Sequence, residues 1–226
     1  MKKTVGIIGG MGPMATADLF RKIIENTPAA CDQEHIHVLI DSNTNIPDRT
    51  KALLCGGESP LPELLRSAER LTNAGADCLI MPCNTAHGFL EPLQAQCRIP
   101  VLNMIALTRE SLKRQGITCA ALLATSGTVR TGVYTKYFGD IRLLTPEPDE
   151  QERVMDMIYG GVKAGVTDYD ASDVQRTAER LLAAGAQTVI LGCTELPLAM
   201  ELYDLDFPSV DPTLELAKGA IRFALG

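Results

Sequence analysis

Residues 68–83, AERLTNAGADCLIMPC, and residues 178–193, AERLLAAGAQTVILGC, are two copies of one pattern and decide the fold. The offset between them is 110 residues without a gap, and nine of the sixteen positions are identical. Each copy reads as a helix, a glycine-containing turn, an apolar strand and then a cysteine where the strand ends. Any two helix–strand units share part of this pattern, but the shared terminal cysteine goes beyond it. We therefore infer an internal duplication.

Strand-like and helix-like stretches alternate along all 226 residues. This alternation is typical of βαβ units, and the unbroken apolar strands indicate helices on both faces of a parallel sheet. The expected fold class is α/β: two similar open parallel-sheet lobes related by pseudo-twofold symmetry, with the active site in the cleft between them. The first lobe is predicted at 1–103 plus 211–226, and the second at 104–210. The expected strands are 5–8, 35–40, 78–81, 101–103, 118–124, 141–144, 188–191 and 209–210, and the expected helices are 15–26, 61–74, 105–114, 151–163 and 172–184, the last with a capping box of Ser172 and Gln175.

The duplicated cysteines, Cys83 and Cys193, indicate a class of reaction. Ligands of open parallel sheets bind outside the carboxyl ends of the strands, where both cysteines are predicted to lie. A helix that begins there lowers the pKa of a thiol and attracts anions. Two equivalent groups on opposite sides of one substrate are what inversion of a stereocentre requires, because one removes a proton and the other returns one. A pair of buried structural cysteines is the alternative, and it is the expected role of Cys31, Cys55, Cys78, Cys97 and Cys119.

Composition excludes several classes of protein. The chain is 46% hydrophobic and 22% charged, and its net charge is −7 with 4% aromatic residues. Nucleic acids and anionic membrane surfaces both favour basic partners, so neither is expected to bind. No apolar run reaches the ~20 residues of a membrane helix, and glycines interrupt the apolar stretch that follows Lys2 and Lys3. An odd number of cysteines, seven, suits a reducing compartment, so the expected location is cytoplasmic.

Two further motifs resemble a cofactor-binding site and a metal site. Residues 10–15, GMGPMA, fit a dinucleotide fingerprint, but Asp41 lies 29 residues beyond Gly12 and Pro13 interrupts the motif. A glycine-rich turn that presents N–H groups to a small carboxylate has the same geometry. The residues Cys31, His35 and His37 suggest a metal site, yet no fourth ligand lies nearby, and no metal is predicted.

Several polar residues near the predicted strand ends have two possible roles. His87 follows Cys83 by four residues and is either a support for the site or a histidine on a helix surface. Asp48 and Arg49 lie on the predicted loop after the second strand, and Lys163 ends a helix in a glycine-rich setting. These three residues are either functional or solvated surface and helix-cap groups.

The two cysteine motifs, PCNTAH at 82–87 and GCTELP at 192–197, resemble those of the aspartate/glutamate racemase family. These are cofactor-independent amino-acid racemases with two cysteines. The resemblance covers essentially the whole chain, and further matches are GGMGP at 9–13, PDRT at 47–50 and ATSGT at 124–128. It is closest to the aspartate racemases, although relatives with the same motifs accept other substrates.

The resemblance implies two α/β lobes, a homodimer, and no cofactor. It implies that Cys83 and Cys193 are the two acid–base catalysts. The α-amino and α-carboxylate groups of the amino-acid substrate would be held by Asn84, Thr85, Thr125, Thr128 and Thr194. In relatives of the aspartate racemase type, residues at the positions of Arg49 and Lys163 hold the side-chain carboxylate. Possible supporting residues are Met11, Asp48, His87 and Glu195.

The sequence therefore predicts a PLP-independent amino-acid racemase that acts on aspartate. Glutamate or a broad range of amino acids is the alternative within the family, because one methylene changes selectivity by only ~1–3 kcal/mol. An NAD-dependent oxidoreductase that uses residues 10–15 is a distant alternative. A non-catalytic module that binds a small molecule is a third.

Overall fold

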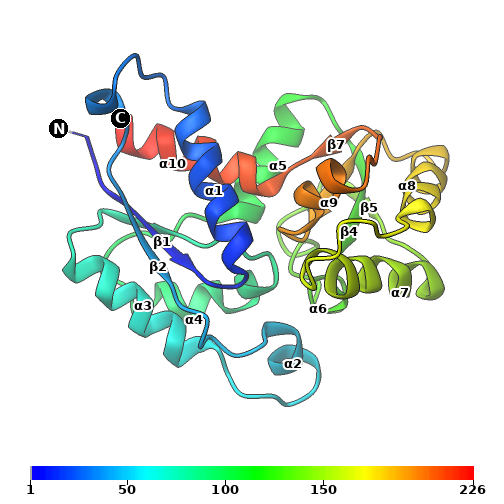
Figure 1. The fold of residues 1–226 in the computed structure, drawn as a ribbon, viewed down its shortest axis with the longest axis horizontal. Coiled ribbons are helices and arrows are strands. Elements are labelled where there is room, and N and C mark those ends of the chain that lie inside the picture. Colours follow the sequence, from blue (N-terminus) through cyan, green and yellow to red (C-terminus); the bar gives the residue numbers. More distant parts are fainter. Residues whose placement is uncertain (1) are drawn as a thin grey trace. The chain divides into compact units, whose positions relative to one another are not determined.

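The computed structural model describes residues 2–226 and divides them into two compact α/β units. The first unit contains residues 2–107 and Thr213–Gly226, and the second contains Thr108–Pro212. The carboxyl-terminal helix α10 (Pro212–Leu225, red in Figure 1) belongs, from Thr213 on, to the first unit. Helix α5 (Met104–Arg114) carries the chain from the first unit into the second.

The first unit is built on a three-stranded parallel sheet in the order β2-β1-β3. Its strands are β1 (Val5–Gly9), β2 (Val38–Ser42) and β3 (Cys78–Ile80). Val5 and Ile7 face one hydrophobic cluster and Ile8 faces another on the opposite side of the sheet. Because both faces are covered, the strand reads as an unbroken apolar run, as expected for a buried parallel sheet.

The helices of the first unit follow the strands. Helix α1 (Pro13–Asn26) begins at Pro13, whose missing N–H suits the first turn of a helix. Its remaining described helices are η1 (Asp32–Glu34), α2 (Arg49–Leu54), α3 (Leu61–Asn73), η2 (Thr85–Phe89), α4 (Leu90–Gln94) and the parts of α5 and α10 given above.

The second unit is built on a four-stranded parallel sheet in the order β5-β4-β6-β7. Its strands are β4 (Cys119–Ala124), β5 (Arg142–Leu144), β6 (Val189–Gly192) and β7 (Ser209–Val210). Its helices are α6 (Ser126–Arg130), α7 (Pro148–Asp156), the π-helix η3 (Met157–Val162), α8 (Ser172–Ala183) and α9 (Leu196–Leu202). The predicted α/β class with two parallel sheets is confirmed.

The duplicated stretch has the same local structure in both units. Helices α3 and α8 each end in a turn whose glycine has positive φ, 97° at Gly75 and 108° at Gly185. The following alanine N–H reaches back to the helix, from Ala76 to Leu71 O at 3.0 Å and from Ala186 to Leu181 O at 3.2 Å. Glycine is needed at this point because a side chain disfavours positive φ.

The sequence misplaced some element boundaries. The second strand begins at Val38 rather than residue 35, because residues 32–34 form the 3₁₀ turn η1. The strand expected at 101–103 is reduced to a single bridge between Leu79 and Val101. The capping box predicted at Ser172 is wrong, since Ala171 is the residue that precedes helix α8 and the carboxylate of Asp170 accepts from the Ser172 N–H.

Within the described residues, no helix is both long and apolar enough to cross a membrane.

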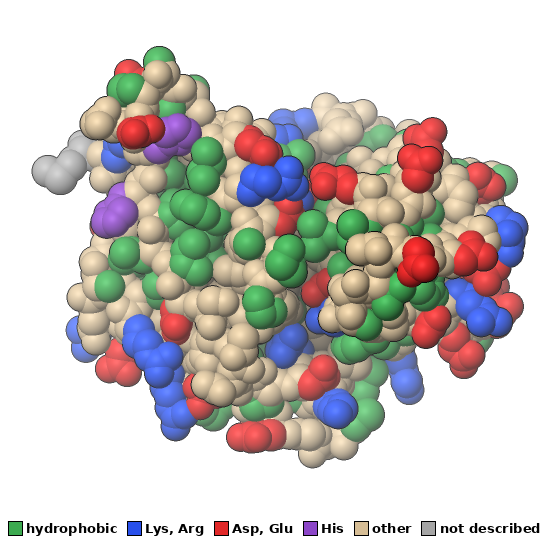
Figure 2. Space-filling view, viewed as in Figure 1, with side chains coloured by type: hydrophobic (Ala, Val, Ile, Leu, Met, Phe, Trp, Pro, Cys, Tyr) green, Lys and Arg blue, Asp and Glu red, His purple; other side chains and the backbone are tan. Residues whose placement is uncertain are grey.

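Large apolar side chains are exposed on the first unit. Phe20 and Ile24 lie four residues apart on α1, and Met14 lies at the start of the same helix. Figure 2 shows hydrophobic side chains gathered over α1 on the visible face.

Candidate active site

Cys83 lies three residues beyond the carboxyl end of β3 in the first unit, and Asn84, the N-cap of η2, follows it. Its N–H donates to Met81 O at 2.9 Å, and the residue is only 6% exposed. Asn84 and Thr85 follow it and are also buried. The duplicated pattern thus places a buried thiol and polar side chains at the edge of the sheet where ligands of parallel sheets bind.

His87 is buried beside the Cys83 loop, so the alternative of a histidine on a helix surface is wrong. Its Nδ1 donates to Cys83 O at 2.9 Å, and its Nε2 accepts from the Met104 N–H at 3.1 Å. The acceptor role of Nε2 assigns the proton to Nδ1. Burial lowers the pKa of His87 to about 4, so the ring is neutral at physiological pH. The imidazole thereby ties the cysteine loop to the start of α5.

We expect this histidine to weaken the fold in mild acid. The unfolded chain takes up the proton near pH 6.5, but the folded chain does so only near pH 4. The contribution of His87 to the free energy of unfolding is therefore fully present above about pH 6.5. It falls by about 3 kcal/mol as the pH decreases toward 4. Urea unfolding at several pH values should show a steeper decline for the wild type than for His87→Asn. The exposed His37→Asn is the control, and equal slopes in wild type and His87→Asn would contradict the prediction.

Arg49, Asp48 and Met11 come together in the first unit. Asp48 is the N-cap of α2, and its carboxylate accepts from the Lys51 N–H at 2.7 Å. Arg49, the first residue of that helix, donates to Pro47 O at 3.0 Å, to Ile46 O at 3.3 Å and to Met11 O at 3.2 Å. The guanidinium is therefore fixed between the start of α2 and the loop after β1. The expected loop around Arg49 is a short helix, which the aspartate N-cap signature could have revealed.

Gly9 and Gly10 are explained by close packing. A Cβ atom at Gly9 would lie 2.4 Å from Thr16 Cγ2, and one at Gly10, where φ is 89°, would lie 2.4 Å from the backbone of Asn43. Asp41, which the dinucleotide interpretation assigned to a ribose, forms an ion pair with Arg70 at 3.2 Å. The fold thus requires these glycines whether or not a nucleotide binds.

Cys193 lies directly after β6 in the second unit and is also 6% exposed. Its Sγ donates to Glu195 Oε2 at 2.8 Å, and the Thr194 hydroxyl donates to the same oxygen at 3.2 Å. Lys163 Nζ lies 3.1 Å from the other carboxylate oxygen, Oε1. Burial first, and then the charge of Glu195, raise the pKa of Cys193 well above its usual value, while Lys163 lowers it. Four of the predicted site residues are thus one cluster.

The backbone at Lys163 is widened by the π-helix η3. The Lys163 N–H donates to Ile158 O at 3.0 Å, five residues back, and the residue caps η3. The ammonium group lies 5.3 Å from the ring centroid of Tyr159. Single-turn π-helices often occur at functional sites, and this one directs Lys163 to the carboxylate of Glu195.

Thr125 and Thr128 form the turn after β4. The Thr125 hydroxyl accepts from the Thr128 N–H at 3.2 Å and lies 3.1 Å from the Thr128 hydroxyl. Tyr134 was not predicted as a site residue; it is 1% exposed, and burial and the charges of Asp211 and Cys193 raise its pKa. Gln151 was not predicted either; it donates to Ala124 O at 2.9 Å. Nothing in the local pattern distinguishes these two polar residues from surface residues.

The other five cysteines were predicted to be buried, and only Cys78 is. Cys78 is buried, and burial raises its pKa to about 12, as expected of an inert thiol. Cys31 and Cys55 are exposed, and Cys97 and Cys119 are partly exposed, so the prediction of burial is wrong for these four. Cys31 and Cys55 lie in loops beside short helices, which offer no core to bury them.

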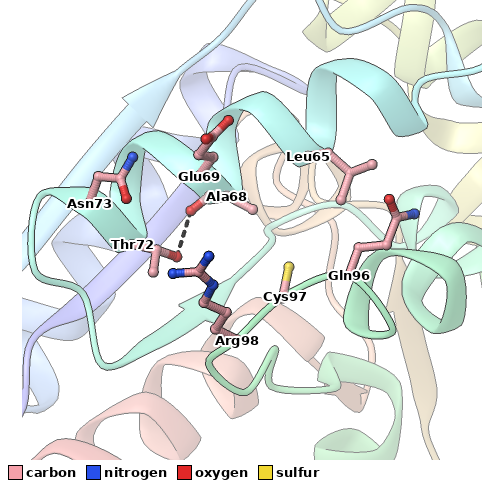
Figure 3. A pocket seen from close by; sticks show the side chains of 8 residues that line it. All are labelled: Leu65, Ala68, Glu69, Thr72, Asn73, Gln96, Cys97 and Arg98. Atoms are coloured by element: carbon pink, nitrogen blue, oxygen red, sulfur yellow. Dashed lines mark hydrogen bonds between the residues drawn. The ribbon is translucent and has the colours of Figure 1, made fainter.

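A pocket of about 260 Å³ lies on the first unit between α3 and residues 96–98 (Figure 3). Its lining includes Leu65, Cys97 and Arg98, and none of the predicted site residues. At the offset of 110, Leu65 corresponds to Gln175, which binds the backbone of Asp206 through two hydrogen bonds of 2.9 and 3.1 Å. Leu65 cannot form such bonds, and it packs together with Cys97 against the hydrophobic cluster of the first unit instead.

Comparisons with known proteins agree with the motifs. A model of the family described as Asp/Glu/Hydantoin racemase matches residues 8–220. The solved structure of the Picrophilus torridus aspartate racemase is similar over 98% of this chain and 94% of that one, with 32% identity and a TM-score of 0.87. The broad specificity amino-acid racemase RacX of Bacillus subtilis is 22% identical over 96% of both chains. The glutamate racemase of Corynebacterium glutamicum is 27% identical over 74% of this chain and 65% of its own length.

Proposed function

The chain belongs to the Asp/Glu/hydantoin racemase family, and we propose that it interconverts L- and D-aspartate by a two-base mechanism that needs no PLP. The observation that carries the proposal is the pair of thiols, Cys83 and Cys193. Each is buried, each follows a strand of a duplicated unit, and each is flanked by hydroxyl or amide side chains. One thiol removes the α-proton and the other supplies a proton to the opposite face of the same carbon.

The α-proton of an amino acid is a weak acid, so the site has to stabilise the carbanion that forms. We assign this task to Asn84 and Thr85 in the first unit and to Thr125, Thr128 and Thr194 in the second. These side chains are buried, and hydrogen bonds to a developing charge are stronger when water is excluded. Between the two proton transfers both cysteines are protonated, and the enolate-like carboxylate carries the negative charge.

Aspartate is favoured by Arg49. Its guanidinium is fixed by three backbone carbonyls, and a fixed guanidinium can hold a carboxylate through two parallel hydrogen bonds. The similarity to the Picrophilus enzyme supports the same substrate. Glutamate is the second candidate, because the family relatives include glutamate racemases and the two substrates differ by one methylene. Lys163 as a second ligand for the side-chain carboxylate stays a prediction.

The test is a screen of all proteinogenic amino acids by chiral chromatography, after dialysis against EDTA and treatment with hydroxylamine to trap carbonyl cofactors. We expect aspartate to racemise fastest, glutamate more slowly and neutral amino acids slowest. Restoration of activity only by PLP or a metal would contradict the cofactor-free mechanism. Binding of L-aspartate without exchange of its α-proton in D₂O would indicate a non-catalytic module instead.

We also propose that two copies of the chain associate. The supporting observation is the exposed apolar face of α1, where Phe20 is 37% and Ile24 is 43% exposed. Apolar side chains that remain exposed at helical spacing indicate a contact surface. Light scattering should give twice the chain mass for the wild type and a lower mass for Phe20→Ser/Ile24→Ser. A wild-type monomer at micromolar concentration would contradict this proposal.

A further inference from the structure

Glu195 lies against only one of the two proposed catalytic thiols. Both of its carboxylate oxygens have partners in the second unit: Cys193 and Thr194 on Oε2, and Lys163 on Oε1. The residue is 5% exposed, so the carboxylate and the Cys193 thiol meet where water screens their charges poorly.

The first copy of the duplication has no equivalent carboxylate. At the offset of 110 residues, Thr85 stands where the second copy has Glu195. Among residues 2–226, a carboxylate hydrogen-bonds the Sγ of Cys193, and none hydrogen-bonds that of Cys83. The two thiols are otherwise well matched, because both residues are 6% exposed and both follow a parallel strand. The two copies can therefore be compared directly: Cys83 shows how such a thiol behaves without a bonded carboxylate, and Cys193 how it behaves with one.

The charges around Cys193 favour its neutral form. Ionisation would place a thiolate in contact with the carboxylate of Glu195, and burial removes the water that would moderate this repulsion. Lys163 offsets part of the repulsion, but its ammonium is shared with Glu195. Burial and the charges of Asp211 and Cys193 raise the pKa of Tyr134, so its phenol stays neutral and adds no charge to this part of the unit.

We propose that the substrate-free enzyme rests with the proton on Cys193 and the negative charge on Cys83, and that Glu195 sets this order. The inference rests on the proposed function, because two-base racemisation requires one thiolate and one thiol at a time. Glu195 is thus a positioning residue: it keeps the proton on Cys193 and does not act on the substrate itself.

The order has a consequence for each turnover. The Cys83 thiolate takes the α-proton, and the electron pair of that C–H bond stays on the α-carbon. Cys193 then gives its S–H proton to the opposite face and becomes a thiolate beside Glu195. Because this form is the less stable one, it returns to rest when Cys193 takes a proton from solvent and Cys83 releases its own. The enantiomer that presents its α-proton to Cys83 is the one that the resting enzyme can process directly.

The experiment is differential alkylation of the whole chain without substrate. Iodoacetamide is applied between pH 6 and pH 10, and mass spectrometry of peptides gives a rate for each cysteine. The reagent attacks the thiolate, so the rate follows the thiolate fraction. At pH 7.5 we expect Cys83 to react at least about tenfold faster than Cys193, with the midpoint for Cys193 at the higher pH.

Variants at Glu195 separate the effect of its charge on the ionisation of Cys193 from the effect of burial. Glu195→Gln keeps the shape but removes the charge, so it should lower the alkylation midpoint of Cys193 and raise its rate at pH 7.5 about tenfold, with little change at Cys83. Glu195→Asp keeps the charge and should remain close to the wild type. Circular dichroism checks that each variant folds, and the wild-type comparison decides the resting order even if one does not.

Equal rates at the two cysteines, or faster alkylation of Cys193 in the wild type, would overturn the proposal. An unchanged Cys193 midpoint in folded Glu195→Gln would overturn the role of Glu195. Alkylation requires no turnover, so its result is independent of the racemase assay. A chain that racemises aspartate with the reverse order contradicts only this inference, whereas a chain that racemises no amino acid contradicts the proposed function.

Discussion

Replacing either Cys83 or Cys193 by alanine should reduce racemisation of aspartate by at least about a thousandfold. Each change leaves one face of the α-carbon without a proton donor or acceptor, so inversion cannot be completed. The double variant should be no worse than the single ones, because the two thiols act as a unit. Chiral chromatography with both enantiomers as starting material measures the loss.

Exchange of the α-proton in D₂O sharpens this test. A variant that keeps one thiol can still remove a proton from one enantiomer and return a deuteron to the same face, so exchange without inversion is expected for that enantiomer alone. Cys97→Ala is the matched control, since Cys97 lines the pocket in Figure 3 and lies outside both cysteine motifs. A single-cysteine variant with turnover close to the wild type would disprove the two-base assignment.

Arg49→Ala should lower kcat/KM for aspartate by about 2–5 kcal/mol in transition-state free energy, which is roughly 30-fold to several thousandfold. The guanidinium is fixed by carbonyls of Ile46, Pro47 and Met11, so it offers a preorganised partner to a second carboxylate. For alanine and homoserine, which lack that carboxylate, the loss should be much smaller. Arg49→Lys should recover only part of the activity, because an ammonium cannot form two parallel hydrogen bonds.

The neutral substrates are the internal control for this variant. Arg49 also links the start of α2 to the loop after β1, so its removal can disturb the fold locally. Damage of that kind lowers all rates together, and equal losses for aspartate and alanine would mean that Arg49 is structural. Lys163→Met is a less direct test of substrate choice, because the same ammonium pairs with Glu195 beside Cys193.

Features that depend on neighbouring residues could be predicted from the amino-acid sequence alone. The repeat at 68–83 and 178–193 predicted helix, glycine turn, buried strand and terminal cysteine, and both units have them. Apolar runs identified β1, β4 and β6 because strands buried on both faces need no polar alternation. The motifs around Cys83 and Cys193 identified the family, since they combine rare residue types at a fixed spacing.

Only the tertiary structure decided which polar groups meet. Lys163 and Glu195 are 32 residues apart in sequence, and no local pattern indicates that their side chains form an ion pair. His87 could have been a surface residue until the fold placed it between Cys83 O and the Met104 N–H. The short helix α2 was missed because a few residues carry too little periodicity for a prediction. Secondary structure follows from local spacing, whereas partners, burial and pKa values follow from contacts that distant segments make when the chain folds.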